Sequence, residues 1–195
     1  MQNFDHRSVV SLSLAEREEF VSRYTDKEKY NPDEIQPTLF IFKDNDKQIK
    51  TLEKEIIMAR RLAKLGYEIY LLPDTLTNSL AIVFDKKIPD AISSGFFIEL
   101  KQSETGSRTS IKRQLREGKD QGDIVYIEIP GSPSQNFIRE SLISQINNSK
   151  SDYDRKIVIT YSKDLYCYTI KEGTLSKGVP CESSTLAKCQ LELLL

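Results

Sequence analysis

Histidine occurs only once in the 195 residues, at His6 close to the N-terminus. Histidine is the side chain most often used as a general acid or base near neutral pH. A catalytic centre built on histidine is therefore not expected. Any enzymatic chemistry would instead rest on carboxylates, lysine and bound metal.

Cysteine is also rare, and occurs only at Cys167, Cys181 and Cys189. These residues do not have the close spacing of metal ligands, and their odd number leaves one without a partner. Disulfides are uncommon in the reducing cytoplasm. We therefore expect reduced thiols in a cytoplasmic protein.

The sequence has no run that approaches the roughly 18 apolar residues needed to span a bilayer. The first seven residues lack the basic and then apolar order of a signal peptide. No membrane association is expected. Charged residues make up 29% and hydrophobic residues 38% of the chain, which is typical of a soluble protein with one domain and at most an appendage.

An excess of positive charge is absent as well, since the formal net charge is −1. Proteins that bind nucleic acid without specificity carry an overall basic excess, so this class is disfavoured. An enzyme with a local basic groove remains compatible with this balance.

Residues 88–101, I-P-D-A-I-S-S-G-F-F-I-E-L-K, carry the most informative pattern. Two short apolar runs flank Ser94-Gly95, a composition that predicts a β-hairpin with a two-residue loop. In that register Asp90 lies directly opposite Glu99, with Cβ atoms about 4.5–5.5 Å apart. Lys101 follows Glu99 by two residues, so both side chains are expected on one face of the strand.

Two carboxylates that face each other repel unless positive charge lies between them. A hard divalent cation bound by oxygens, with Lys101 beside it, would supply that charge. The alternative is a surface hairpin whose acidic residues are solvated. The pattern favours the site, because one face of the second strand is apolar and the other mixed: Phe96, Ile98 and Leu100 on the first, Phe97, Glu99 and Lys101 on the second.

The strongest helical signal covers residues 44–65, where apolar residues recur at three and four positions and Gly66 is the expected stop. Glu55 lies at the edge of that apolar stripe. It is either a solvated boundary residue or a carboxylate directed toward a metal. Glu53 is the competing candidate and lies further from the stripe.

The rest of the chain divides into an N-terminal extension, residues 1–43, and further alternating elements. The extension has a capping box at Ser13 that predicts a helix to about Tyr24. The other expected elements are strands at 38–42, 67–72, 80–84, 123–129, 156–161 and 165–170, a helix capped by Thr109 or Ser110 that ends near Gly118, and a helix from Ser134 to Ile146.

The helix after the E-x-K strand has a basic face formed by Lys112, Arg116 and Lys119, bordered by Arg113. Such a stripe is either a solvated surface or a contact for the phosphate backbone of a nucleic acid. Residues 171–195 form a C-terminal tail, with helical spacing over 183–195 that predicts a packed helix or an interface for a homodimer.

Both the motifs and the order of elements over residues 44–170 resemble the PD-(D/E)XK phosphodiesterase superfamily. Within it, E-I-I-M-A-R-R-L-A-K-L-G-Y, I-P-D-A and I-E-L-K are similar to the C-terminal nuclease domains of contact-dependent growth inhibition toxins and to related domains of phage head-morphogenesis proteins. S-I-K-R-Q-L and Q-G-D-I-V-Y-I are similar too. The resemblance implies a restriction-endonuclease-like α/β core, a central mixed sheet flanked by helices, with an N-terminal helical extension.

The resemblance also implies roles for single residues. It places Glu55, Asp90 and Glu99 as ligands of Mg²⁺ or Mn²⁺, and Asp90, Glu99 and Lys101 as the catalytic set. Gln121 matches a polar position that some members keep near the site. The implied partners are nucleic acid, either tRNA or DNA, and an immunity protein.

Three functions are consistent with these observations. The first is a metal-dependent nuclease of the toxin type, in which Lys112, Arg113, Arg116 and Lys119 contact the substrate backbone. The second is a catalytically inactive relative that acts as a nucleic-acid binding or phage assembly module. The third is a sheet-forming interaction protein without nucleic acid. Fold analogy alone does not separate them.

Overall fold

The computed structural model describes residues 24–28, 39–42, 49–71, 89–93, 96–148 and 150–182. The chain forms two compact units, Met1–Phe97 (unit 1) and Ile98–Leu195 (unit 2). Both units contain helix and strand, and parallel as well as antiparallel strand pairs occur. The chain is therefore a mixed α/β protein with mixed sheet pairing.

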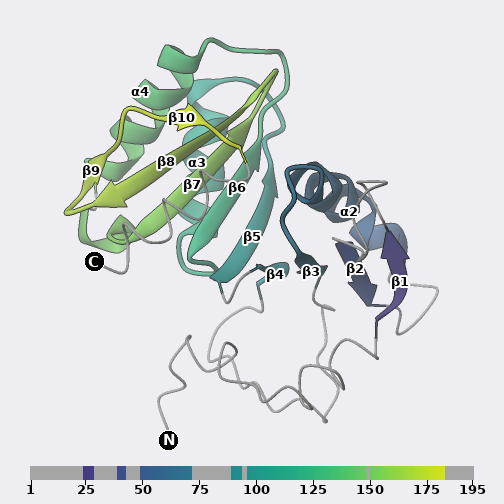
Figure 1. Ribbon diagram of the computed structural model, residues 1–195. Helices are drawn as coiled ribbons and strands as arrows, with labels where there is room; N and C mark the ends of the chain where they lie inside the picture. Colours follow the sequence, from purple (N-terminus) through teal and green to yellow (C-terminus); the bar gives the residue numbers. More distant parts are fainter. Residues whose placement is uncertain are drawn as a thin grey trace, which may run out of the picture. The chain divides into compact units, whose positions relative to one another are not determined.

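Unit 1 contains one described helix and four short strands (Figure 1). The strands are β1 (Tyr24–Glu28), β2 (Leu39–Phe42), β3 (Ile69–Leu71) and β4 (Ala91–Ser93). β1 pairs antiparallel with β2, β2 runs parallel to β3, and β3 pairs antiparallel with β4. The predicted strand at 38–42 is confirmed, and the one at 67–72 is confirmed in a shorter form.

Helix α2 (Ile49–Ala63) confirms the helix expected over 44–65, within the described residues. Its buried face includes Met58, Ala59 and Leu62. The helix ends where Gly66 adopts a φ of 87° and donates its N–H to the Ala63 carbonyl over 2.9 Å. Glycine adopts this left-handed conformation without steric strain, which explains the stop.

Some expectations for unit 1 differ from the structure or lie outside the described residues. Strand β1 begins at Tyr24, where the sequence predicted the end of a helix. The remainder of that helix, and the strand predicted at 80–84, lie outside the described residues. β4 ends at Ser93 and β5 begins at Phe96, as the two-residue loop predicted.

In unit 2 the strands follow the order β5-β6-β7-β8-β10, with β9 also paired to β8. β5, β6 and β7 are parallel, and β8 is antiparallel to β7. Parallel neighbours need crossover connections, which α3 and α4 supply. The elements are β5 (Phe96–Gln102), α3 (Arg108–Gly118), β6 (Ile124–Glu128), α4 (Gln135–Ile146), the 3-10 helix η2 (Lys150–Tyr153), β7 (Lys156–Tyr161), β8 (Leu165–Lys171), β9 (Thr174–Leu175) and β10 (Val179–Pro180).

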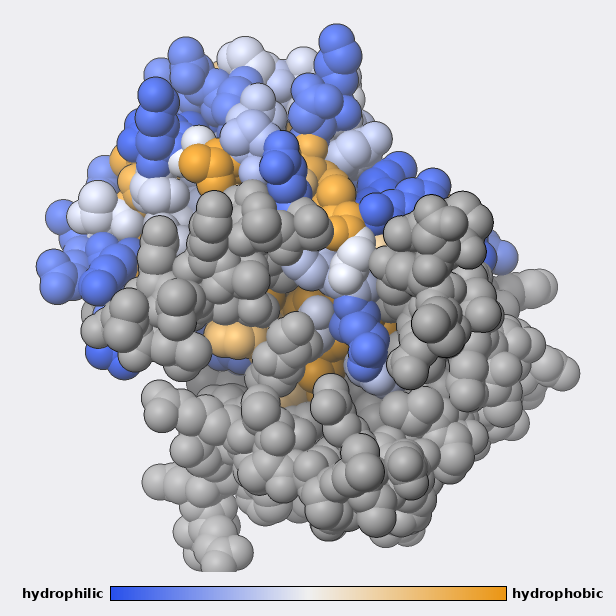
Figure 2. All heavy atoms as spheres, in the orientation of Figure 1, coloured by the Kyte–Doolittle hydropathy of each residue, from blue (hydrophilic) through white to orange (hydrophobic). Residues whose placement is uncertain are grey.

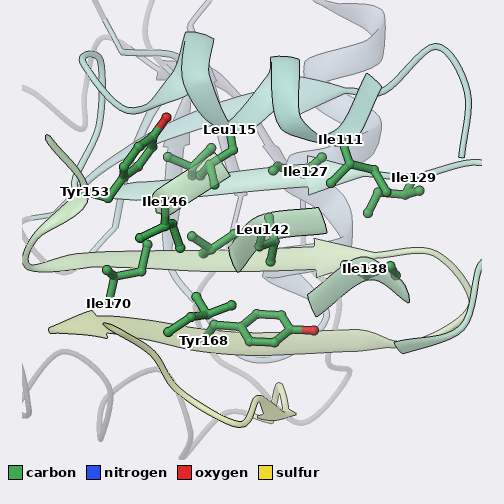
Figure 3. Close-up of a cluster of buried hydrophobic side chains, with 13 residues drawn as sticks. Ile111, Leu115, Ile127, Ile129, Ile138, Leu142, Ile146, Tyr153, Tyr168 and Ile170 are labelled. Carbon is green, nitrogen blue, oxygen red and sulfur yellow. The ribbon is translucent and has the colours of Figure 1, made fainter. Parts of the chain in front are cut away.

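The core of unit 2 lies between α3 and α4 and one face of this sheet (Figure 3). Apolar residues at three and four positions along each helix point toward apolar residues at every second position of the strands. The helices contribute Ile111, Leu115, Ile138, Leu142 and Ile146, and the strands Val125, Ile127, Val158, Tyr168 and Ile170. The expected strand at 156–161 and the helix capped by Ser134 are confirmed.

Tyr168 of β8 brings a polar group into this core. Burial raises the pKa of its phenol to about 12, while the Thr160 hydroxyl and the Arg139 guanidinium act in the opposite direction. The side-chain amide of Gln135 donates to the phenol oxygen. The phenol is therefore protonated throughout the physiological pH range.

The N-terminus of α3 corrects one expectation, because the cap is Ser107 and not Thr109 or Ser110. The Ser110 backbone N–H donates to Ser107 Oγ over 3.3 Å. The Ser110 hydroxyl itself is buried and lies 2.7 Å from Ser103 Oγ. Ser110 already lies inside the helix and uses its hydroxyl for this contact, so it does not cap the helix. The N-cap therefore lies three residues before Ser110, at Ser107.

Ser107→Ala is expected to lower the free energy of unfolding by about 1 kcal/mol, because it removes the acceptor for an N–H that the helix cannot satisfy. Thr109→Ala is the matched control, and is expected to change the free energy of unfolding by less than about 0.5 kcal/mol. Urea unfolding followed by circular dichroism measures both. A larger loss for Thr109→Ala would contradict the observed cap.

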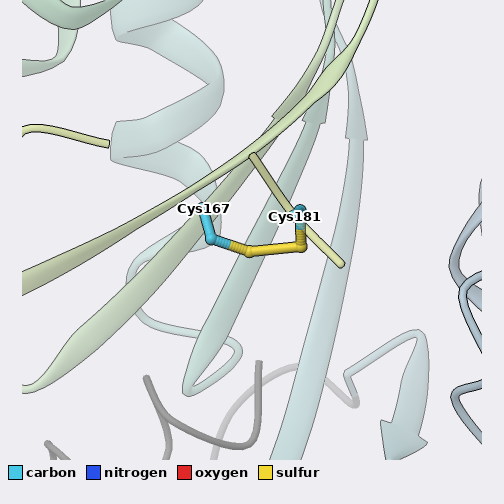
Figure 4. The surroundings of a disulfide bond; sticks show 2 residues. All are labelled: Cys167 and Cys181. Carbon is cyan, nitrogen blue, oxygen red and sulfur yellow. A yellow bond between two sulfur atoms is a disulfide. The ribbon is translucent and has the colours of Figure 1, made fainter. Parts of the chain in front are cut away.

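The cysteines differ from the expectation of reduced thiols, which was wrong for two of the three. Cys167 of β8 and Cys181, which follows β10, form a disulfide (Figure 4). β10 pairs antiparallel with β8, and this brings the two Cα atoms to 5.2 Å. Both residues are buried. The bond therefore links β8 to the chain that leaves β10.

Among the described residues, no helix has the length and apolar character needed to cross a bilayer. Of the expected tail, residues 171–195, the structure describes positions up to 182, which include β9 and β10. The helix or dimer interface expected over 183–195 lies outside the described residues.

Candidate active site

Glu99 and Lys101 contact each other on β5. Lys101 Nζ donates to Glu99 Oε1, and the two form an ion pair. The side chain of Glu99 is 1% exposed and that of Lys101 is 20% exposed. The alternation of a strand predicted that the two would share a face, and the contact confirms it.

Apolar groups lie beside the stem of the Glu99 side chain. Glu99 lies in register with Val125 of β6, and the last turn of α3 lies close by, since a Cβ on Gly118 would be 3.6 Å from Glu99 Cγ. The second carboxylate oxygen, Oε2, is buried too. Moving a carboxylate from water into such surroundings costs of order several kcal/mol, which the Lys101 ammonium partly offsets.

Burial also decides between two interpretations of this strand. The expected apolar face is buried at Ile98 and Leu100, and the mixed face is buried at Phe97 and Glu99. The interpretation as a surface strand with solvated acidic residues is therefore wrong for Glu99. Glutamate is seldom buried this completely in a folded protein, and strongly desolvated charged groups are common at functional sites. Glu99 is therefore a candidate functional residue.

The other predicted metal ligands belong to unit 1. Asp90 is half-buried and directly precedes β4. On α2, Glu55 is half-buried at the edge of the apolar stripe, while Glu53 is exposed. This difference favours Glu55 over Glu53. Because Glu99 belongs to unit 2, the opposition of Asp90 and Glu99 stays a prediction.

Two of the basic residues on α3 have partners within unit 2. Lys112 Nζ donates to Ser144 Oγ of α4 over 3.2 Å. Arg113 pairs with Glu104 over 2.9 Å and lies 4.0 Å from Glu117. A nucleic acid that contacted these side chains would have to compete with carboxylate and hydroxyl groups already present.

Two further basic residues differ in exposure. Arg116 is exposed on α3, whereas only 16% of the Lys119 side chain is exposed. The Lys119 amine lies 3.3 Å from Asp120 Oδ1 and 5.7 Å from the centroid of the Tyr153 ring. Gln121 donates its side-chain amide to the Glu117 carbonyl over 2.8 Å. Arg116 is therefore the most accessible cation of the predicted stripe.

Hydrophilic side chains cover the described surface at the top of Figure 2, where α4 lies in Figure 1. One exposed ion pair of unit 2 links Arg108 of α3 to Glu140 of α4 over 3.0 Å, with 48% and 64% of the side chains exposed. Arg108 also lies 5.5 Å from the centroid of the Phe137 ring. This exposed pair contrasts with the pair of Glu99 and Lys101, in which the carboxylate is buried and the lysine is only partly exposed.

Sequence reasoning gave Gly118 no role beyond the end of a helix. In the structure it is buried and adjoins both Val125 and Glu99. A glycine within a helical pattern was the available signal, because such a residue is unfavourable there unless close packing requires it.

A scan against protein-family models finds no match, and a search of curated proteins finds none either. A search of solved structures matches a chain described as the CdiA-CT/CdiI toxin and immunity complex from Burkholderia pseudomallei. The TM-score is 0.38 and the sequence identity 19%, and the match covers 77% of this chain and 96% of that chain. The fold class of this chain follows from its own elements, which define a mixed α/β protein with a partly buried acid–lysine pair on β5.

Proposed function

We propose that this protein is a metal-dependent nuclease that hydrolyses phosphodiester bonds of nucleic acid. In this proposal the core is of the PD-(D/E)XK type over residues 44–170, and Asp90, Glu99 and Lys101 act at the reacting bond. The buried contact between Glu99 and Lys101 carries the proposal. It combines an anionic oxygen donor and a cation in one place, as the E-x-K motif predicts.

The ion pair of Glu99 and Lys101 is better explained by a functional role than by a contribution to stability. A buried ion pair is often no more stabilising than apolar residues of similar size. β5 is otherwise apolar at Phe97, Ile98 and Leu100, so a fully apolar strand would complete the same core. Strongly desolvated charged groups are typical of catalytic sites, although structural ion pairs also occur.

The donor set fits a hard divalent cation in its chemistry. Asp90, Glu99 and Glu55 offer carboxylate oxygens, which Mg²⁺ and Mn²⁺ prefer. Among the described residues, no group of three or more His, Cys, Asp or Glu side chains is arranged as a metal site. Convergence of these three is thus part of the proposal. A bound cation would polarise the phosphoryl group and supply a water of lowered pKa.

Residues of the chain would orient the metal, stabilise the transition state and bind the substrate. Glu99 would hold its carboxylate in a fixed direction, because the strand and the end of α3 enclose it. The Lys101 amine would move from Glu99 to the developing charge on the phosphate, or would orient the attacking water. Arg116, which is exposed, would contact the substrate backbone, with Lys112 and Arg113 on α3 and Lys119 at its C-cap nearby.

The substrate class follows from the resemblance of the E-I-I-M-A-R-R, I-P-D-A and I-E-L-K segments to the toxin nuclease domains. We propose tRNA or DNA as substrate, a toxin-type role and an immunity protein as partner. Such a partner would cover the site, and its binding would then be expected to prevent cleavage.

A second candidate is a catalytically inactive module that binds nucleic acid or takes part in assembly. One observation favours it: the carboxylate that a metal would need is already engaged by Lys101. In this case the pair would be a structural remnant. The module would bind nucleic acid without cleaving it.

The purified 195-residue chain is expected to cleave pooled tRNA, single-stranded DNA or duplex DNA in the presence of Mg²⁺ or Mn²⁺, and EDTA is expected to abolish cleavage. Gel electrophoresis of end-labelled substrates measures the products. Restoration by Mn²⁺ after removal of EDTA is the control for irreversible damage. Binding without cleavage would favour the inactive module, and cleavage that persists in EDTA would contradict the metal requirement.

A further inference from the structure

The last turn of α3 lies unusually close to the sheet at Gly118. A Cβ added to this residue would be 2.6 Å from Val125 Cγ1, 3.4 Å from Val125 Cγ2 and 3.6 Å from Glu99 Cγ. The first distance is far below any ordinary van der Waals separation. Only a hydrogen atom at this position allows the observed approach of the helix.

Val125 cannot easily move away from such a contact. It is fully buried in β6, in register with Glu99 of β5 on one side and Val158 of β7 on the other. Its β-branched side chain has few rotamers, and the core around it is closely packed. A methyl group at position 118 would therefore displace the end of α3 rather than Val125.

The end of α3 also contributes to the enclosure of Glu99. Gly118 is buried and its neighbour Leu115 is fully buried, so this turn is anchored in the core. The Gly118 carbonyl accepts from the Gln121 N–H over 3.1 Å, which fixes the turn that follows. A displaced helix end would open the space beside the Glu99 carboxylate to water.

We propose that Gly118 is a positioning residue for Glu99, an inference that rests on the proposed function of that carboxylate as a ligand for a divalent cation. The missing side chain lets α3 close over Val125 and the stem of Glu99. The closed helix end keeps water from the carboxylate and holds it in the direction that contacts Lys101. Gly118 itself touches neither cation nor substrate.

The test compares Gly118→Ala with Gly106→Ala in the full-length chain. Gly106 is a matched control because its added Cβ would lie 2.6 Å from the Pro130 carbonyl oxygen, an equally close conflict, but just before the N-cap of α3. Gly118→Ala is expected to weaken Mn²⁺ binding by about 10-fold or more in isothermal titration calorimetry, as changes behind metal ligands commonly do. Gly106→Ala is expected to leave the Mn²⁺ affinity unchanged.

A second readout needs neither metal nor activity. In metal-free protein the ¹⁵N NMR signal of the Lys101 ammonium, assigned by its absence in Lys101→Met, reports the contact with Glu99. Gly118→Ala is expected to broaden or remove this signal, and Gly106→Ala to retain it. If wild-type protein binds no Mn²⁺ but the signal responds in this way, the positioning role stands and the proposed metal site fails.

Should Gly118→Ala not fold, the same contact is tested from the opposite side. Val125→Ala removes the methyl groups on which the helix end rests, and Val158→Ala is its control in the next strand. Val125→Ala is expected to weaken the Lys101 signal and Val158→Ala to retain it. An unchanged Lys101 signal in Gly118→Ala or Val125→Ala, or an equal change in the controls, would overturn the proposal.

Discussion

Lys101→Met is expected to reduce metal-dependent cleavage about 100-fold or more, which is the usual effect of removing one group that stabilises charge in the transition state. The substitution keeps the length of the side chain but removes the ammonium. Because Lys101 contacts Glu99, the change also removes the ammonium that pairs with this carboxylate's Oε1. Initial cleavage rates at saturating Mg²⁺ measure the effect.

The matched control is Glu140→Gln, which breaks the ion pair of Arg108 and Glu140 in the same unit. That pair is exposed, and surface pairs contribute roughly 0–1 kcal/mol. Glu140→Gln is therefore expected to cleave at the wild-type rate. Wild-type cleavage by purified, folded Lys101→Met would remove Lys101 from the mechanism.

Lys101→Met is also expected to lower the free energy of unfolding, and this effect can be distinguished from its effect on cleavage. Lys101→Met removes the Lys101 ammonium from a carboxylate that stays buried, which costs about 3 kcal/mol, the lower end for buried pairs because Lys101 is partly exposed. Lys101→Met combined with Glu99→Met is expected to regain most of this stability, since two apolar groups replace the pair. Cleavage is not expected to return. Recovery of both in the double variant would mean that the pair is only structural.

Loss of the disulfide between Cys167 and Cys181 is expected to lower the free energy of unfolding by about 3 kcal/mol. The two residues are 14 positions apart, and a loop of this size restricts the unfolded chain by about that amount. Cys167→Ala with Cys181→Ala avoids placing a polar hydroxyl in the core, where both cysteines are buried. Urea unfolding with and without reductant measures the difference.

Cys189→Ala is the control for this experiment, because it removes the cysteine outside the pair and is expected to leave the reductant effect intact. Intact-mass measurement of alkylated protein counts the free thiols. Three free thiols in native protein, with no response to reductant, would support the original expectation from the sequence. One free thiol would support the disulfide.

The regular elements were largely predictable, because their signals are local. The stripe around Ala59 and Leu62 predicted α2, and Ser134 predicted the start of α4. The strand at 156–161 was predicted to the residue. In these cases the periodicity, the cap and the burial all favour one conformation, so neighbours in sequence are enough to specify it.

The start of α3 shows where local signals fail. Ser107, Thr109 and Ser110 all have the chemistry of an N-cap. Ser103, which directly follows β5, contacts the Ser110 hydroxyl and so distinguishes among the three. The distinction depends on a contact between the strand and the helix, which sequence spacing does not contain.

Some features of the candidate site were likewise predictable from local sequence, and others depended on packing. The period of two in β5 was sufficient to predict that Glu99 and Lys101 share a face. It did not predict that Glu99 would be buried, since that depends on the packing of α3 at Gly118. The helical spacing of α3 did not predict that Arg113 would pair with Glu104, and Arg116 is the most accessible cation of the predicted stripe.

Local sequence patterns were enough to predict the α/β class, most described elements and the shared face of Glu99 and Lys101, because each follows from interactions between residues close together in the chain. The burial of Glu99, the close approach of Gly118 to Val125 and the pairing of Cys167 with Cys181 became visible only in the folded chain. These depend on which distant segments meet when the sheet and helices pack. Contacts of that kind are set by the whole fold, and no local pattern encodes them.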